Sequence, residues 1–380
     1  MKRLLFIIIL LSSRYAVLMA QSSADSSNVH ISLPERAINL CEKILHALTI
    51  ENNNWEMALY PAASYSGRTG LSVGVMPMMR IKHDARPWTT ITPSFLVSTK
   101  GMFEVQCDAD IYPTERSTIT AKAEFYYLPD DFYNIGNERN KKVEATMNVY
   151  QSQFLCDFHT KFIGDKWQIG LTADVCHHNY KKIDGADSAR VTINYAEGWN
   201  NGFGPLLVFD SRDDKLYARS GTFLKIKFLE YGAYFGSEHN YGVLTFDIRR
   251  YFAVAQQSTF ALQLYAQQTT DRAPFHHQAT FAGTRLARAI DHNLKYVDRS
   301  AWLAQGEFRF PLFWRVGAVA WAAAGNVAHR SDKLFYDSHL MAGAGLRFRV
   351  FKRQNLNLRL DGGVSSRGES AIYFNIREAF

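Results

Sequence analysis

The chain has 380 residues, a formal net charge of +7 and an aromatic content of 14%. After the N-terminal region, no apolar run approaches the ~20 residues that a membrane-spanning helix needs. The four cysteines are too few for a disulfide-stapled scaffold. This composition argues against a helical membrane protein and a small disulfide-rich domain, and it is typical of strands that have one apolar and one polar face.

The first residues predict export. Lys2 and Arg3 precede the apolar run 4–11, which is too short to span a membrane and suits a signal peptide. We expect residues 1–20 to form that signal, with cleavage after Ala20. An uncleaved anchor is the disfavoured alternative. Removal of this segment lowers the formal charge from +7 to +4, which predicts no nucleic-acid partner.

Residues 21–55 predict a periplasmic N-terminal segment with a short helix. Ser32 is the expected N-cap, Glu35 follows three residues later, and Pro34 lies in the first turn. An apolar stripe follows, formed by Ala37, Ile38, Cys41, Ile44, Leu45 and Leu48. The helix is expected to cap or plug a barrel mouth, and a membrane-surface or partner-docking helix is the alternative.

Residues 56–380 predict a transmembrane antiparallel β-barrel of about 16 strands, an all-β fold. The alternating segments are 56–64, 71–82, 89–99, 101–112, 118–128, 143–155, 166–178, 203–211, 221–231, 240–252, 257–269, 300–310, 315–326, 337–349, 355–363 and 371–379. A soluble sandwich shows similar alternation, but with shorter strands. The length and even number of the segments favour the membrane barrel.

The alternation also assigns faces. In 300–310, Trp302 and Phe308 are expected to point outward, with Glu307 and Arg309 in the lumen. In 355–363 the leucines at even positions are expected to face lipid, and Arg359 and Asp361 the lumen. A hairpin turning at 164–165 would set Cys156 and Cys176 on opposite faces, which disfavours a disulfide between them.

Two long connections, 179–202 and 270–299, are expected to lie on the outer side of the membrane. The second contains His276, His277, Asp291 and His292, which are candidate general bases for a barrel enzyme. No Ser or Asp partner has a recognisable spacing, so we predict no catalytic residue. No Cys/His cluster has metal spacing and no phosphate-binding loop is present, so we predict no metal and no cofactor.

The last eleven residues alternate and end on Phe380. This is the form of the C-terminal signal of bacterial outer-membrane barrels, in which the final strand pairs with the first. We expect Phe380 to share the lipid-facing side of that strand with Ile372, Phe374 and Ile376, at the membrane interface. Only Glu378 interrupts the apolar face.

Several strings resemble the BamA/TamA superfamily of outer-membrane barrels, the bacterial surface-antigen domain. The matching positions are Asp210, Arg212 and Asp213 before Gly221, then Gly283 and Arg288 in the long loop, Glu307 and Arg309 in the following strand, Gly325, and the terminal Phe380. The resemblance implies a bacterial outer-membrane location and a long loop that folds into the lumen. It also implies that the loop arginine meets an inward carboxylate, with Glu307 preferred over Asp361.

The chain departs from the family pattern in several places. Arg288 is followed by Ala289 where the family has Gly and an aromatic residue, and Arg285 competes for the same role. Where the family often has an acidic residue on the thirteenth strand, this chain has Trp321 and three alanines. Family members that insert or translocate proteins carry POTRA domains, and residues 21–55 have no room for one.

Three functions follow as hypotheses. The first is a BamA/TamA-type barrel that assists the insertion or translocation of outer-membrane proteins or lipids. Its partners are outer-membrane lipids, client proteins and the barrel assembly machinery, which reads the C-terminal strand. The second is a passive pore or structural barrel, whose lumenal cations would favour anions: Lys225, Lys227, Arg249, Arg309, Arg347, Arg349 and Arg359. The third, an enzyme, is the least supported.

Overall fold

The computed structural model describes residues 49–66, 69–270, 272–283, 285–349, 357–376 and 378–380. The predicted signal peptide and the predicted helix with Ser32 as its N-cap lie outside these residues. No helix among them is long and apolar enough to cross a membrane.

The described residues form seventeen strands, one α-helix and three short 3-10 helices. The strands are β1 (Thr49–Glu51), β2 (Trp55–Ser66), β3 (Gly70–Ile81), β4 (Thr89–Ser98), β5 (Phe103–Ile111), β6 (Ser117–Phe132), β7 (Ala145–Ile163), β8 (Trp167–Gly185), β9 (Gly198–Asp210), β10 (Gly221–Tyr231), β11 (Tyr241–Ala253), β12 (Thr259–Thr269), β13 (Ser300–Phe313), β14 (Val316–Ala328), β15 (His339–Arg349), β16 (Asn357–Ser365) and β17 (Ser370–Ile376). The helices are α3 (Asp187–Tyr195), η1 (Ala233–Phe235), η2 (Phe275–His277) and η3 (Ser331–Lys333).

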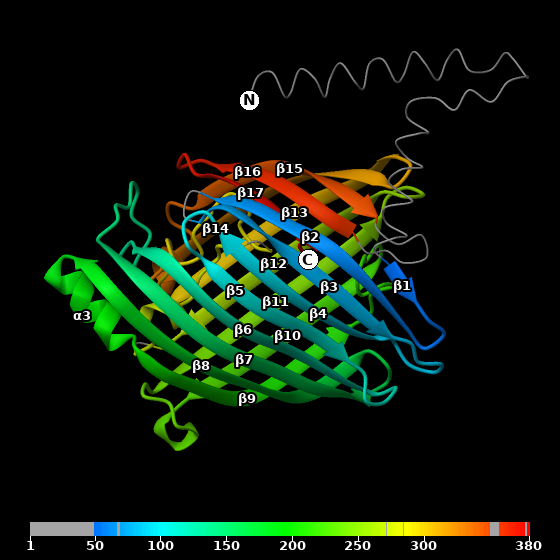
Figure 1. Ribbon diagram of the computed structural model, residues 1–380, viewed down its shortest axis with the longest axis horizontal. Coiled ribbons are helices and arrows are strands. Elements are labelled where there is room, and N and C mark those ends of the chain that lie inside the picture. Colours follow the sequence, from blue (N-terminus) through cyan, green and yellow to red (C-terminus); the bar gives the residue numbers. More distant parts are fainter. Residues whose placement is uncertain (1–48, 67–68, 271, 284, 350–356, 377) are drawn as a thin grey trace, which may run out of the picture. The chain divides into compact units, whose positions relative to one another are not determined.

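Strands β2 to β17 follow one another around a barrel (Figure 1). Each pairs antiparallel with the next, including β9 with β10. The last strand, β17, meets the first long strand, β2, through the pair Ile372↔Tyr65. Along the described residues this contact is short, so β2 and β17 are joined over less of their length than β2 and β3 are.

The sixteen predicted strands are all present, and the fold class is confirmed. The seventeenth strand, β1, was not predicted, and it pairs with β2 at Thr49↔Ala58. The predicted connection 179–202 is shorter than expected because β8 continues to Gly185 and β9 begins at Gly198. Helix α3 lies between them, and Ala189 and Ile193 are its buried residues.

The predicted faces are confirmed. On β13 the Phe308 side chain is 40% exposed, whereas Glu307 and Arg309 are buried. On β16 Leu360 is exposed while Arg359 and Asp361 are buried. The registers Cys156↔Ala173 and Gln153↔Cys176 are those expected from a turn at 164–165, and Cys156 and Cys176 are unbridged. Lipid-facing apolar residues and lumenal charges therefore alternate along the strands.

The C-terminus differs from the prediction. Strand β17 ends at Ile376 instead of continuing to residue 379, and Phe380 does not lie at the lipid interface. Its side chain is 5% exposed and packs in a buried cluster with Ala218, Tyr251 and Ala261. Glu378 is the one charged residue on the otherwise apolar side of the last segment. Its carboxylate accepts a hydrogen bond from Arg347 inside the barrel, so the end of the chain turns inward.

The long connection between β12 and β13 lies against the inner wall. Its residues Phe281, Ala287, Ile290 and Tyr296 are buried in one apolar cluster with wall residues of β13, β14 and β15. The wall residues of this cluster are Ala301, Leu303, Val319, Trp321, Ala323, Val327 and Met341. The connection therefore supplies part of the barrel's own core and is not a solvated outer loop.

Candidate functional site

Arg288 lies at the centre of the lumenal site. Its Nη1 donates to Glu307 Oε2 at 2.6 Å and to Asp361 Oδ2 at 3.3 Å, and its Nη2 donates to Gln305 Oε1 at 3.3 Å. The side chain is fully buried. The structure therefore brings Arg288 together with both carboxylates that the sequence nominated, and Glu307 is the nearer one.

Arg285 does not take this position. Its residue is exposed, and its backbone carbonyl accepts a hydrogen bond from Gln305 Nε2 at 3.1 Å. Between the two arginines the chain makes a turn in which the Ala287 N–H donates to the Phe281 carbonyl at 3.1 Å. Gly283 adopts a φ of 138°, which L side chains rarely adopt, so this turn favours glycine.

Gly325 has a packing role beneath the loop. A Cβ atom at this position would lie 2.8 Å from Phe281 Cδ2 and 2.8 Å from the Trp302 carbonyl oxygen. The absence of a side chain on β14 therefore lets Phe281 approach the wall. This contact fixes the loop at Phe281, seven residues before Arg288.

Trp321 stands where the family often has an acid. The guanidinium carbon of Arg288 lies 4.5 Å from the centroid of the Trp321 ring. The Trp321 ring occupies space that only glycine leaves free, because a Cβ at Gly343 or Gly363 would come within about 2.5 Å of it. Arg288 thus makes a cation–π contact in addition to its ion pairs, and such a contact contributes about 1 to 2 kcal/mol when desolvated.

Three further lumenal arginines complete a buried charge network. Arg309 Nε donates to Glu307 Oε1 at 2.7 Å, Arg347 Nη1 donates to Asp361 Oδ1 at 2.7 Å, and Arg359 Nη1 donates to Asp361 Oδ2 at 2.7 Å. Each member is nearly inaccessible to solvent. Removal of a carboxylate from such a network leaves buried guanidinium groups uncompensated, which costs about 3 to 5 kcal/mol.

The end of the chain joins the same network. Arg347 Nε donates to Glu378 Oε2 at 2.6 Å, and Asn357 Nδ2 donates to Glu378 Oε1 at 2.7 Å. Arg309 Nη2 donates to the backbone carbonyl of Phe380 at 2.7 Å. The loop, the wall strands and the C-terminal residues are therefore connected through shared arginines. The sequence reasoning missed Glu378, although its charge on an apolar strand face was the available signal.

The Asp210 motif forms a separate structure at the turn between β9 and β10. Arg212 Nε and Nη2 donate to the two carboxylate oxygens of Asp210 at 2.9 and 2.8 Å. Asp213 Oδ1 accepts the backbone N–H groups of Asp214, Arg219 and Ser220. Both carboxylates order the turn. A cavity of about 520 Å³ reaches from this motif to Glu378 and Phe380.

Most of the lumenal cations named for a pore have anionic partners. Lys225 pairs with Asp157 and Arg249 with Asp247, in addition to the network around Glu307 and Asp361. A pore lined by such ion pairs carries little net positive charge with which to select anions. The observed pairing weakens that hypothesis.

The outer part of the long connection has its own anchors. His292 Nε2 lies 2.8 Å from Asp130 Oδ1, and Lys295 Nζ and Tyr296 Oη both donate to Glu369 Oε1, at 3.2 and 2.5 Å. Burial raises the pKa of Glu369, but hydrogen bonds from Ser365 and Tyr296 and the charge of Lys295 outweigh it and lower the pKa to about 2. His292 is thus a buried anchor of the loop.

A second polar group was not foreseen. Cys176, His178 and His277 lie close enough for their potential ligand atoms to fall within 4.8 Å of one another. Spacing along the chain gave no sign of it because His277 is about a hundred residues from the other two. His276, the other candidate base, is bonded through Nδ1 to Tyr180 Oη at 2.8 Å.

The fold is similar to solved outer-membrane structures. BamA from Haemophilus ducreyi lacking POTRA domains 1–3 aligns with a TM-score of 0.54 and 10% identity, over 86% of this chain and 70% of that chain. CdiB from Escherichia coli gives 0.56 and 12%, over 86% and 63%. CdiB from Acinetobacter baumannii gives 0.53 and 11%, over 93% and 69%. The chain thus spans about two thirds of the length of these structures.

No curated protein matches the chain by sequence. Residues 109–374 match the Omp85 superfamily domain. This match includes the long connection, the strands that carry Glu307 and Asp361, and most of β17. The expected BamA/TamA-type barrel is thereby confirmed. The chain belongs to the Omp85 superfamily and is a β-barrel protein of the bacterial outer membrane.

Proposed function

We propose that this barrel assists the insertion or translocation of client outer-membrane proteins at the seam between β2 and β17. The seam itself is the observation that carries the proposal. Among the described residues, strands β2 and β17 pair at Ile372↔Tyr65, whereas β2 and β3 pair along the whole of Trp55–Ser66. The ring is therefore weakest where its first and last long strands meet.

A weak seam suits strand exchange. Backbone N–H and C=O groups that face lipid without partners are costly, so a strand edge in the membrane accepts another strand. A client strand that pairs with β2 or β17 supplies those hydrogen bonds, as in other cases of strand addition. This work uses pairing energy and requires no catalytic group and no cofactor.

The lumenal network supports the same proposal. Because Glu378 and the Phe380 carbonyl bind Arg347 and Arg309, residues 378–380 lie in the lumen. The network thus fixes the end of the chain that follows the seam strand β17. Arg288 connects the long loop to the same carboxylates, so the position of the loop and the state of the seam are coupled.

The passive pore has less support. The inward loop and the paired cations lie in the lumen, and two of the cavities there have volumes of about 520 and 570 Å³. In planar bilayers we expect purified protein to show low, irregular conductance. A steady, anion-selective conductance would favour the pore instead.

A depletion experiment tests the proposal. Cells depleted of the protein should lose one or more other outer-membrane proteins, while total synthesis of those proteins stays unchanged. Wild-type protein supplied from a plasmid should restore them, and Arg288→Ala should restore them poorly. Loss of surface lipid with normal outer-membrane proteins would redirect the function to lipid. No change in either would contradict the proposal.

A further inference from the structure

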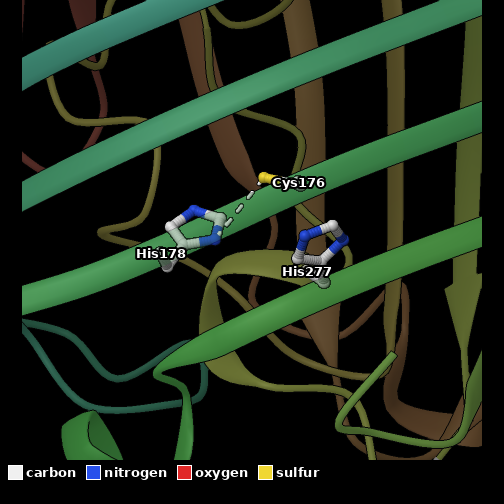
Figure 2. A group of neighbouring side chains, drawn as sticks. All are labelled: Cys176, His178 and His277. Carbon is white, nitrogen blue, oxygen red and sulfur yellow. Dashed lines mark hydrogen bonds between the residues drawn. The ribbon is translucent and has the colours of Figure 1, made fainter. Parts of the chain in front are cut away.

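Three side chains inside the barrel form a group suited to a metal ion. Cys176 and His178 are two residues apart on β8, so both point into the lumen, and both are buried. His277 comes from η2 in the long connection and faces them (Figure 2). Cys176 Sγ lies 3.5 Å from His178 Nδ1, and all three potential ligand atoms lie within 4.8 Å of one another.

The geometry is close to that of a tetrahedral zinc site. With Zn–S near 2.3 Å and Zn–N near 2.0 to 2.1 Å, tetrahedral angles require a sulfur-to-nitrogen separation of about 3.5 Å. Cys176 and His178 already have this separation. Only the His277 ring has to move, by roughly 1 Å, to complete three ligands at such distances.

The hydrogen bond of His178 Nε2 leaves Nδ1 available as a metal ligand. Its Nε2 lies 2.7 Å from Gln151 Oε1, and that oxygen also accepts the Tyr126 hydroxyl at 2.7 Å. Since Gln151 Oε1 is an acceptor, Nε2 carries the proton and Nδ1 keeps its lone pair toward Cys176. Metal-bound histidines are commonly held in this way by an oxygen behind the ring.

Aromatic rings restrict both histidines of the group. The His276 ring is stacked on His178 with centroids 3.5 Å apart. The rings of Tyr231 and Tyr241 lie 5.1 and 5.6 Å from His277. These contacts limit the rotation of the two imidazole rings, so their orientation toward Cys176 is largely set before an ion binds.

We propose that Cys176 Sγ, His178 Nδ1 and His277 bind one zinc-class divalent ion, with the fourth position open to water. A thiolate and two imidazoles favour such ions over Mg²⁺ or Ca²⁺. Binding requires loss of the Cys176 thiol proton to the buffer. The ion joins the long connection to β8, on a wall remote in sequence from the Arg288 contacts with β13 and β16, and so provides a second fixed point for the loop.

Cobalt provides a direct probe. The full chain is purified in detergent without a polyhistidine tag, reduced, treated with chelator and titrated with Co²⁺. We expect one equivalent to bind with intense tetrahedral d–d bands and a thiolate-to-cobalt charge-transfer band, and Zn²⁺ to displace it. Cys176→Ser should abolish the charge-transfer band, whereas the matched controls Cys156→Ser and Cys107→Ser should retain it.

Two further variants keep the test sharp. His277 belongs to the connection and not to a strand, so His277→Gln should remove the tetrahedral spectrum without preventing barrel assembly. Gln151→Leu should weaken Zn²⁺ binding by about 10- to 100-fold through loss of the oxygen behind His178. Zn²⁺ should also slow proteolysis of the connection in wild type only. Absence of tetrahedral cobalt, or an unchanged spectrum in Cys176→Ser or His277→Gln, would overturn the site.

Discussion

The backbone carbonyl of Phe380 accepts a hydrogen bond from Arg309 Nη2 at 2.7 Å, so the last residue of the chain is held inside the barrel. The same guanidinium binds Glu307 through Nε at 2.7 Å. Glu307 in turn binds Arg288 of the long connection. The C-terminus and the loop, separated by about ninety residues of sequence, are therefore linked through Arg309 and Glu307.

Deletion of Phe380 should reduce assembly more than expression. The deletion removes the acceptor of Arg309 and the packing against Tyr251. Loss of a buried Phe side chain alone costs about 3 to 5 kcal/mol. Heat-modifiable gel migration of membrane extracts measures the folded fraction. Phe380→Tyr, which keeps the ring and the carbonyl, should behave close to wild type; normal assembly of the deletion would count against this role.

Arg288 and Glu307 should act as a unit. Each single alanine substitution should lower the free energy of unfolding by about 3 kcal/mol, because each leaves buried charge without its partner. The double variant should cost about 1 to 3 kcal/mol less than the sum of the two. Urea unfolding in detergent measures the three values.

The exposed Arg285 provides the control for this cycle. Arg285→Ala should lower the unfolding free energy by less than Arg288→Ala does, because Arg285 is exposed and Arg288 is buried. Strict additivity of the Arg288 and Glu307 losses would contradict a direct contact. A larger loss for Arg285 than for Arg288 would mean that the arginines exchange roles.

Adjacent positions on β16 should respond in opposite ways. Leu358→Arg places a charge on the lipid face at a cost of about 2 to 4 kcal/mol near the bilayer centre. Arg359→Leu should be tolerated, because Asp361 keeps Arg347 and Arg288 as donors. The folded fraction recovered in the outer membrane measures both. Equal losses for the two variants would overturn the assignment of faces.

The outer anchor of the loop should weaken in acid. The pKa of Glu369 is lowered from 4.5 to about 2, so the carboxylate stabilises the fold above pH 4.5 and this contribution is lost as the pH falls toward 2. The difference in melting temperature between wild type and Glu369→Gln should therefore be largest near neutral pH and shrink in acid. A constant difference across pH would refute the anchor.

The strands and their faces could be predicted because each depends on local alternation. Residues two apart on a strand point to the same face of the sheet, and a lipid-facing position excludes charge. The alternation of Leu358, Arg359 and Leu360 therefore shows which face is lipid-facing and which is lumenal. The contact of Arg288 with Glu307 was also accessible, because a confined guanidinium requires a carboxylate and the strand parity placed Glu307 inside.

Other features depended on contacts between distant segments. The inward turn at Glu378 requires Arg347 and Asn357, which no alternation pattern associates with the C-terminus. The Cys176 and His277 group exists because the long connection returns to β8, and the sequence contains no spacing that indicates it. Helix α3 was missed since its residues lie in a connection whose length was overestimated.

The proposed function requires β2 and β17 to separate at their seam. Tyr65→Cys with Ile372→Cys places two thiols at the position where the described residues of β2 and β17 pair, and Tyr65→Cys with Leu71→Cys places the same thiol against β3 as a control. Each pair is introduced into the depletion strain, and levels of the other outer-membrane proteins are measured with and without reductant. We predict that the oxidised seam pair abolishes complementation, that reductant restores it, and that the control pair complements throughout. Full complementation by a quantitatively cross-linked seam would contradict the claim.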